Sequence, residues 1–305
     1  MATNTAKYEA VLRDLTRKFD LGFSQSNPFY PSVCTEVMST GADEKYAWLG
    51  QVPSVREWLG DRVFNEMRAS DFVLTNKLWE DSIFVPKTNI DDDRMGLYGS
   101  MFENLGQRAA LHPDKLLMEA IVAGESTACH DGQYFFDTDH AWGDSGTQDN
   151  DLTGAAATGT LPTEAEFKAA LETSVAAMLG FKDDRGEPFN QPTVGQLNNL
   201  TVLVPIAYYA IAVKAVTAAI LSNNSNVQVW SPNVVASPFL TSGAKFYTFY
   251  TGSPLKPFVF QKREPISRQS KGANDIETKD VKFMTQARYN VGYLAWWNAV
   301  LYTFT

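Results

Sequence analysis

A long β-type run over residues 281–304 is the feature that most constrains how this chain can fold. It is rich in aromatic and β-branched residues: Val281, Phe283, Tyr289, Val291, Tyr293, Trp296, Trp297, Val300, Leu301, Tyr302 and Phe304. Such residues favour strands, and large apolar side chains in this number have to be buried against other layers. A second β-type run, Pro257–Gln261, precedes it. We therefore expect a substantial sheet to which this part of the chain contributes core.

The composition excludes several classes of protein. Of 305 residues, 44% are hydrophobic and 20% charged, which excludes a disordered chain, a collagen and a coiled coil. With 26 basic and 35 acidic residues the net charge is −9, and an acidic chain is a poor general binder of nucleic acid. No apolar run reaches the roughly 18 residues of a membrane span, and residues 1–20 lack the apolar core of a signal peptide. The two cysteines, Cys34 and Cys129, exclude a disulfide framework.

Residues 1–60 do not look like an independently packed domain. Lys7–Phe19 has helical spacing of its apolar residues and predicts a short amphipathic helix. Glycine and proline residues then break any longer element, while aromatic residues continue: Phe23, Phe29, Tyr30, Tyr46, Trp48 and Trp58. A disordered tail would be poor in aromatic residues. We expect an extended arm that lies on another surface; a loop-rich lobe packed on its own core is the alternative.

Two short β-type runs, Phe72–Thr75 and Ser82–Val85, flank the polar segment 76–81. This pattern predicts a long hairpin over residues 71–86 with Trp79 near its tip. A tryptophan is costly to leave in water, so we expect Trp79 to meet a partner surface. The alternative is that Trp79 packs into the core of its own domain.

Helical patterns occupy two regions. The pattern over residues 95–123 follows three aspartates, which suit a helix N-terminus better than a metal cluster, and His112–Pro113 predicts a kink or break in it. In the second region, Thr163 and Glu166 form a capping-box signal, followed by a strand at Thr201–Val204 and an enclosed helix at Ile206–Leu221. This order indicates a small α/β unit over residues 161–255. The preceding segment, residues 143–160, predicts a mobile loop.

Thiol, imidazole and carboxylate groups gather between residues 129 and 140. The candidates are Cys129, His130, Asp131, Asp137, Asp139 and His140, all of ligand types that zinc accepts. Their spacing matches no standard zinc motif, and neighbouring ligands diverge if they lie on a strand. We therefore favour a hairpin with turn-forming aspartate and histidine over a metal site, and a Cys129 nucleophile is weaker still.

Other signals of chemistry are missing. The sequence has no phosphate-binding glycine motif and no nucleophile-elbow motif. Its one small basic group, Lys262, Arg263, Arg268 and Lys271, is too thin for specific recognition of nucleic acid. We expect no catalytic, cofactor-binding or metal-binding residues and no cofactor. An arm, a hairpin and many aromatic residues favour an assembly protein.

Several blocks of the sequence together resemble the Mu-like phage major head subunit family. They run in family order through Tyr46–Gly50, Pro53, Arg56–Arg62, Asn76–Glu80, Ile90–Asp93, Gly96–Tyr98, His112–Asp114, Asp131–His140 and Ala287–Tyr293. One departure is Ala141, where the family pattern has proline after the aspartate–histidine pair. Residues 1–40 match least well.

The resemblance implies an α+β protein with the HK97-like capsid fold. It implies an N-terminal arm, an extended β-hairpin loop, a peripheral domain with a long spine helix, and an axial α/β domain. On this sequence these parts are assigned as follows: arm 1–60, extended loop 61–94, peripheral domain with spine helix 95–160, axial domain 161–255, and return strands of the peripheral domain 256–305.

The implied function is that of a major capsid protein of a tailed double-stranded DNA phage. Copies would form the hexamers and pentamers of an icosahedral head, in the virion and assembled in the bacterial host cytoplasm. Packaged DNA would be held non-specifically at the inner surface, with scaffold, portal and cement proteins as further partners and no membrane. Expected contacts between subunits are Trp48, Trp58, Arg62, Phe72, Leu78, Trp79 and Phe84. The alternative function is a metal-dependent hydrolase using Cys129, His130, Asp139 and His140.

Overall fold

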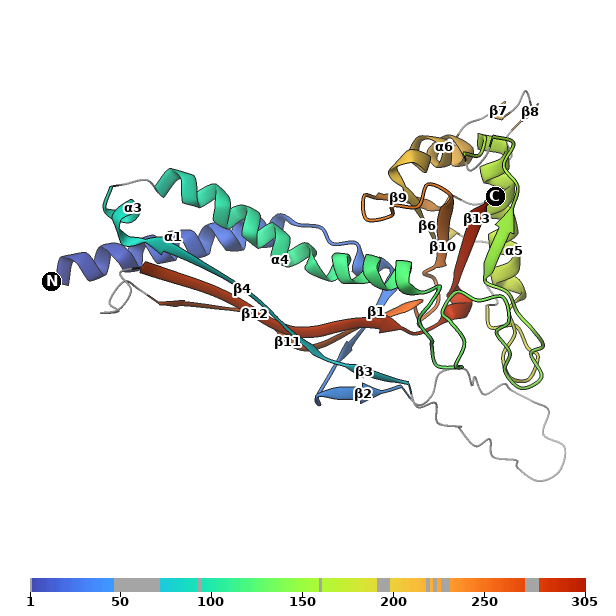
Figure 1. The fold of residues 1–305 in the computed structure, drawn as a ribbon, viewed down its shortest axis with the longest axis horizontal. Coiled ribbons are helices and arrows are strands. Elements are labelled where there is room, and N and C mark those ends of the chain that lie inside the picture. The colour runs from blue at the N-terminus through green and yellow to red at the C-terminus, as the bar shows by residue number, and fades with distance from the viewer. Residues whose placement is uncertain are drawn as a thin grey trace.

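The computed structural model describes residues 2–46, 72–92, 95–158, 161–190, 198–217, 220–221, 224–225, 231–271 and 280–305. Two sheets organise these residues (Figure 1). The first has four strands in the order β1-β11-β12-β4 and carries two long helices along one face. The second has five strands in the order β5-β13-β10-β6-β9. The presence of both helices and sheets confirms the α+β class.

The four-stranded sheet is built on two long antiparallel strands, β11 (Phe258–Lys271) and β12 (Asp280–Tyr293). Strand β1 (Cys34–Met38) pairs with β11 in parallel. Strand β4 (Lys77–Pro86) pairs with β12 in antiparallel register along its whole length and forms the other edge. The β-type patterns of 257–261 and 281–293 thus become the centre of this sheet.

Helices α4 (Met95–Ala123) and α1 (Ala2–Gln25) lie side by side over one face of this sheet (Figure 1). Helix α4 runs through Pro113 without a break. The two helices are in close contact at Gly22 and Gly106, where an added side chain would collide with the backbone of the other helix. Together with the sheet they enclose a separate core: Leu12, Leu15, Phe19, Val85, Ile90, Phe102, Leu105, Val281 and Phe283.

The amphipathic helix predicted at residues 7–19 is therefore present and longer, but it does not reach out as an arm. Its apolar stripe is buried against α4 and β12 of the same chain, with the Phe19 and Phe283 rings 5.5 Å apart. Residues 2–25 are one helix that lies on α4 and the sheet of the same chain, so this part of the region is not a loop-rich lobe with a core of its own.

The hairpin predicted over residues 71–86 is wrong. The short strand β3 (Val73–Thr75) pairs with β2 (Asp43–Lys45), while β4 runs on past Trp79 without turning back. The reason is that β12 offers β4 an uninterrupted partner, with no register shift between them. The two-stranded ribbon is thus β2–β3, and the segment that joins its strands lies outside the described residues.

The five-stranded sheet has β13 (Ala299–Phe304) and β10 (Lys245–Tyr250) near its centre. Their outer neighbours are β5 (Asp151–Gly154), β6 (Leu200–Pro205) and β9 (Asn233–Ser237). Strand β13 pairs with β10 and β5, so the end of the predicted 256–305 return segment lies in this sheet and not with the peripheral strands. Strand β5 also replaces part of the loop predicted at 143–160.

Two helices, α5 (Glu164–Gly180) and α6 (Ile206–Thr217), pack on the five-stranded sheet. The capping box predicted at the start of α5 is confirmed, with both reciprocal hydrogen bonds formed between Thr163 and Glu166. Short elements complete the described chain: α2 (Tyr30–Val33), α3 (Lys87–Asp91), η2 (Trp296–Asn298), β7 (Ile220–Leu221) and β8 (Asn224–Ser225). Because β7 begins at Ile220, the predicted helix over 206–221 ends earlier than expected.

Candidate functional site

The face of the four-stranded sheet that points away from α1 and α4 is only partly covered. Successive side chains of a strand point to opposite faces, so Val85 lies in the core while its neighbour Phe84 points outward. Leu78 and Phe84, both on the outward face of β4, are 67% and 62% exposed. The β2–β3 ribbon covers only one end of this face, around Leu74. We call the remainder, which includes Leu78 and Phe84, the open sheet face.

A groove of about 410 Å³ lies at the Phe84 end of the sheet. Its lining is mixed, with apolar, polar and charged side chains of both signs from three strands: Ser82, Phe84, Gln269, Lys271, Asp280, Lys282 and Met284. Two of the expected contact residues, Leu78 and Phe84, are thus placed where another molecule could reach them.

Trp79 and Phe72 are placed differently. The Trp79 indole N–H donates a 2.9 Å hydrogen bond to the carbonyl of Tyr289, and its ring meets the His112 imidazole edge-on at 4.6 Å. The Nδ1 atom of His112 lies 2.8 Å from the Tyr289 hydroxyl. Phe72 is half-buried against the Tyr46 ring. Trp79 therefore packs within its own chain, as the alternative prediction had it. Trp48, Trp58 and Arg62 lie outside the described residues.

A second exposed apolar group, which the sequence analysis missed, lies on the five-stranded sheet. Parallel strands β6 and β9 end side by side, with Pro205 opposite Ser237. Ile206 follows the first strand and Phe239 follows the second, and Tyr209 is one turn along α6 from Ile206; all three are exposed. The register places the ends of the two strands side by side, and register could not be read from the sequence.

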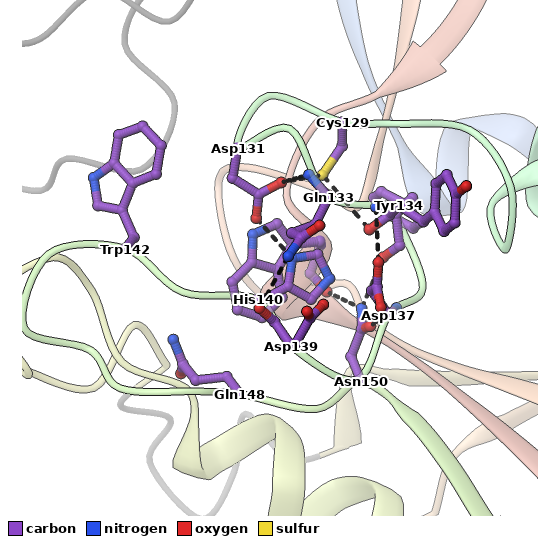
Figure 2. A network of polar contacts seen from close by, with 12 residues as sticks. Cys129, Asp131, Gln133, Tyr134, Asp137, Asp139, His140, Trp142, Gln148 and Asn150 are labelled. Atoms are coloured by element: carbon purple, nitrogen blue, oxygen red, sulfur yellow. Dashed lines mark hydrogen bonds and ion pairs between the residues drawn. The ribbon is translucent and has the colours of Figure 1, made fainter.

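Cys129, Asp131 and His140 point toward one another inside the loops that follow α4 (Figure 2). The Cys129 thiol donates to Asp131 Oδ1 at 2.9 Å, and His140 Nδ1 lies 2.6 Å from Asp131 Oδ2. The three side chains are almost wholly removed from water. His140 also stacks flat on the Trp296 ring, at 3.9 Å between centroids. We call these three residues the buried triad.

Burial and hydrogen bonding set the charges in the triad. Burial, reinforced by the neighbouring Asp131, raises the pKa of the Cys129 thiol far above its ordinary value, so the thiol keeps its proton. Burial opposes ionisation of Asp131, but hydrogen bonds from His140 and Cys129 outweigh it and lower the pKa of that carboxyl. Asp131 is therefore an acceptor for both neighbours. Burial lowers the pKa of the adjacent His130 to about 4, so that imidazole is neutral.

The four residues named for a hydrolase do not come together. Asp139 is exposed, and the residue that joins Cys129 to His140 is Asp131. A thiol held in its protonated form is a poor nucleophile. The turn signal of Asp131 followed by Gly132, whose φ is +89°, was the one sequence feature that could have pointed to this convergence.

Asn150 ties the same loops to the five-stranded sheet. Its side-chain amide donates to the carbonyls of Phe135 and Ala299, at 2.9 and 3.2 Å, and its Oδ1 accepts from the Asp137 amide at 2.9 Å. Because Asn150 is fully buried, these bonds satisfy groups that water cannot reach. Sequence analysis gave no signal for this role.

A charged group lies where α4 ends against the five-stranded sheet. Glu125 pairs with Lys245, and Asp151 lies nearby at the start of β5. Burial first, and then the charge of Glu125, raise the pKa of Asp151 to about 6.

Among the described residues, no helix combines the length and apolar character needed to cross a membrane.

Comparison with known families gives two matches. The model of the Mu-like prophage major head subunit gpT matches residues 8–163, and that of a phage capsid protein family matches residues 87–300. The Mu-like prophage FluMu major head subunit of Haemophilus influenzae is 39% identical over 135 residues, 44% of either chain. The major capsid protein of Escherichia phage Mu is 30% identical over 140 residues, 46% of either chain. Each match thus spans less than half of the relative.

Solved structures extend the likeness over nearly the whole fold. The procapsid of bacteriophage JBD30 aligns with 97% of this chain and 74% of its own, at 25% identity and a TM-score of 0.58. The mature capsid of bacteriophage PhiM1 aligns with 92% of this chain and 88% of its own, with a TM-score of 0.61. At 13% identity, the second likeness speaks for the fold alone.

Proposed function

Because this chain belongs to the Mu-like prophage major head subunit family, we propose that it assembles in many copies into a phage head. In this proposal it is the major capsid protein of a tailed double-stranded DNA phage. Its copies form hexamers and pentamers of an icosahedral shell, built in the host cytoplasm and retained in the virion. The matches to two families of head proteins support this proposal, together with the likeness of its fold to solved capsids.

The observation that carries the proposal at residue level is the open sheet face. The other face of the same sheet is sealed by α1 and α4, whereas Leu78 and Phe84 stand exposed. Phe84 lines the groove, and exposed apolar side chains around a hollow are typical of surfaces that another protein covers. A neighbouring copy that covers them would remove both from water. We propose Leu78 and Phe84 as contacts between subunits, and Trp79 as a core residue of its own subunit.

We propose that the packaged genome is held without sequence recognition. The net charge of −9 gives weak repulsion from DNA, which suits a container better than a binder. Scaffold, portal and cement proteins are proposed as further partners on the strength of the family alone.

Electron microscopy and size-exclusion chromatography of the purified full chain test the proposal. We expect capsomers or closed shells from the wild-type protein, alone or with its scaffold. The double substitution Leu78→Asp and Phe84→Asp should leave a folded subunit that no longer assembles. Met101→Asp is the matched control, because Met101 is an exposed apolar residue on the solvent side of α4.

Two results would count against the proposal. A wild-type chain that stays monomeric under every assembly condition would contradict the proposed function. Normal shells from the double variant would remove the open sheet face as the contact while leaving the function in place.

A further inference from the structure

The buried triad brings to one point the three ligand types that zinc prefers. Cys129 Sγ, a carboxylate oxygen of Asp131 and a ring nitrogen of His140 all lie within 4.8 Å of one another. We propose that the triad binds one zinc ion, which fastens the loops between α4 and β5. This inference concerns the stability of the subunit and does not depend on the proposed function.

If residues 129 and 130 lay on a strand, their side chains would point apart and could not bind one ion together. The structure has a turn there. The Gly132 amide donates to the Cys129 carbonyl at 3.2 Å, and Gly132 has a positive φ of +89°. The turn points the side chains of Cys129 and Asp131 to the same side, where His140 meets them (Figure 2). The proposed ligands are therefore Cys129, Asp131 and His140, and the adjacent residues 129 and 130 do not both have to point at the ion.

The distances between ligand atoms in the buried triad are close to those in a zinc site, although protons and not an ion lie between the atoms. Zinc bonds of about 2.3 Å to sulfur and about 2.0 Å to nitrogen or oxygen, in tetrahedral geometry, separate ligand atoms by roughly 3.3–3.6 Å. The present separations are 2.9 Å from sulfur to oxygen and 2.6 Å from nitrogen to oxygen, each bridged by a proton. For zinc to replace the protons, the sulfur–oxygen and nitrogen–oxygen distances would each have to grow by no more than about 1 Å.

The filled site is electrically balanced. Zinc bound by a thiolate, a carboxylate and a neutral imidazole carries no net charge, and burial penalises net charge. On binding, the Cys129 thiol releases its proton to solvent as sulfur becomes a ligand.

The surrounding chain has a use for such a cross-link. Between the end of α4 at Ala123 and the start of β5 at Asp151, the structure forms no named helix or strand. The segment is held by the isolated bridges Ala128–Tyr134 and His140–Gln148 and by side-chain bonds. Irregular segments of this length are uncommon in compact domains.

Metal analysis and cobalt spectroscopy of the purified full chain test the inference. We expect about one zinc per chain after growth with zinc, and a near-ultraviolet thiolate-to-cobalt band when Co²⁺ is added to the stripped protein. Zinc at a hundredfold excess over its Kd should raise Tm by about 4 °C. Cys129→Ser and Asp131→Asn should each abolish the band and the Tm increase. Cys34→Ser, at the other buried cysteine, and Asp139→Asn should change neither.

Each result decides the question. Loss of the band in Cys129→Ser and Asp131→Asn, with both controls normal, supports the site. If stripped wild-type protein gives no cobalt band and no Tm increase, the triad is a hydrogen-bonded cluster only. If zinc binds equally well to Cys129→Ser, its site lies elsewhere. Circular dichroism of each variant separates loss of metal from loss of fold.

Discussion

Asp151→Asn should stabilise the subunit at neutral pH and leave it unchanged in acid. Asp151 stands at the start of β5, beside the ion pair of Glu125 and Lys245. Burial and the charge of Glu125 raise its pKa, Lys245 opposes them, and Asp149 and Asp137 add smaller contributions of the same sign as Glu125. With these carboxylates sharing one ammonium group, an ionised Asp151 costs the folded state free energy.

The magnitude follows from the pKa. A pKa of about 6 against an ordinary 3.8 corresponds to roughly 3 kcal/mol, at about 1.4 kcal/mol per pH unit. Asp151 is only half-buried, and solvent screening reduces the figure to about 1–1.5 kcal/mol. Because the pKa is raised in the folded chain, folding takes up a proton between the two values. Stability is therefore full below pH 3.8, falls as the pH rises to about 6, and is constant above.

Thermal denaturation from pH 4 to pH 8 measures this effect. Asparagine keeps the size of the side chain but never ionises, so the variant should escape the loss. Its Tm should equal that of the wild type near pH 4 and exceed it by about 2–4 °C above pH 6.5. The exposed Asp139→Asn serves as control and should give a constant difference. A Tm difference for Asp151→Asn that does not change with pH, or a variant less stable at pH 8, would refute the reasoning.

Three further substitutions test the packing. Gly106→Ala should lower the free energy of unfolding in urea by about 1–3 kcal/mol and speed hydrogen exchange in α1, because the new methyl group meets the Phe19 carbonyl. The control Gly99→Ala should change neither quantity, because only a lysine side chain lies nearby, 3.8 Å away. Trp79→Ala should lower the stability of the isolated subunit by about 2–3 kcal/mol in urea unfolding, since the half-buried ring is lost together with its hydrogen bond. Thr163→Ala should cost about 1 kcal/mol in the same assay by removing the cap of α5, whereas Thr163→Ser should restore it.

Local signals in the sequence predicted local structure well. The capping box at Thr163 located the start of α5 because the two bonds involve residues only three positions apart. The apolar stripe of residues 7–19 identified a helix because its period is a property of the stretch itself. The pattern over 95–123 likewise became α4, with Pro113 absorbed inside the helix.

Strand partners could not be predicted in this way. The runs 72–75 and 82–85 read correctly as β-type, but the sequence does not say which strand lies beside them. The partner of β4 is β12, and the bond from the Thr285 hydroxyl to the Asp81 carbonyl joins residues 204 positions apart. From the sequence alone, the nearest β-type run is the obvious partner, which predicts a hairpin. All three residues of the buried triad are among the candidates that the sequence offers, but the pattern does not single them out, since their convergence depends on a turn and on the placement of His140.

The period of β4 nevertheless contained information about function. Trp79, Ile83 and Val85 share one parity and so must share one face, and that face packs on α4 and the core. Leu78 and Phe84 share the other parity, so the same strand presents large apolar side chains on both faces, one sealed by its own helices and one not. The solvated face of an antiparallel sheet is normally polar, so exposed leucine and phenylalanine side chains on it are unusual for a surface that stays in water. Within a lone subunit only one face is buried, and a neighbouring copy can supply the cover for the second. Substitutions of the two parities should therefore separate: Trp79→Ala weakens the subunit, while Leu78→Asp with Phe84→Asp leaves the subunit intact and weakens its assembly.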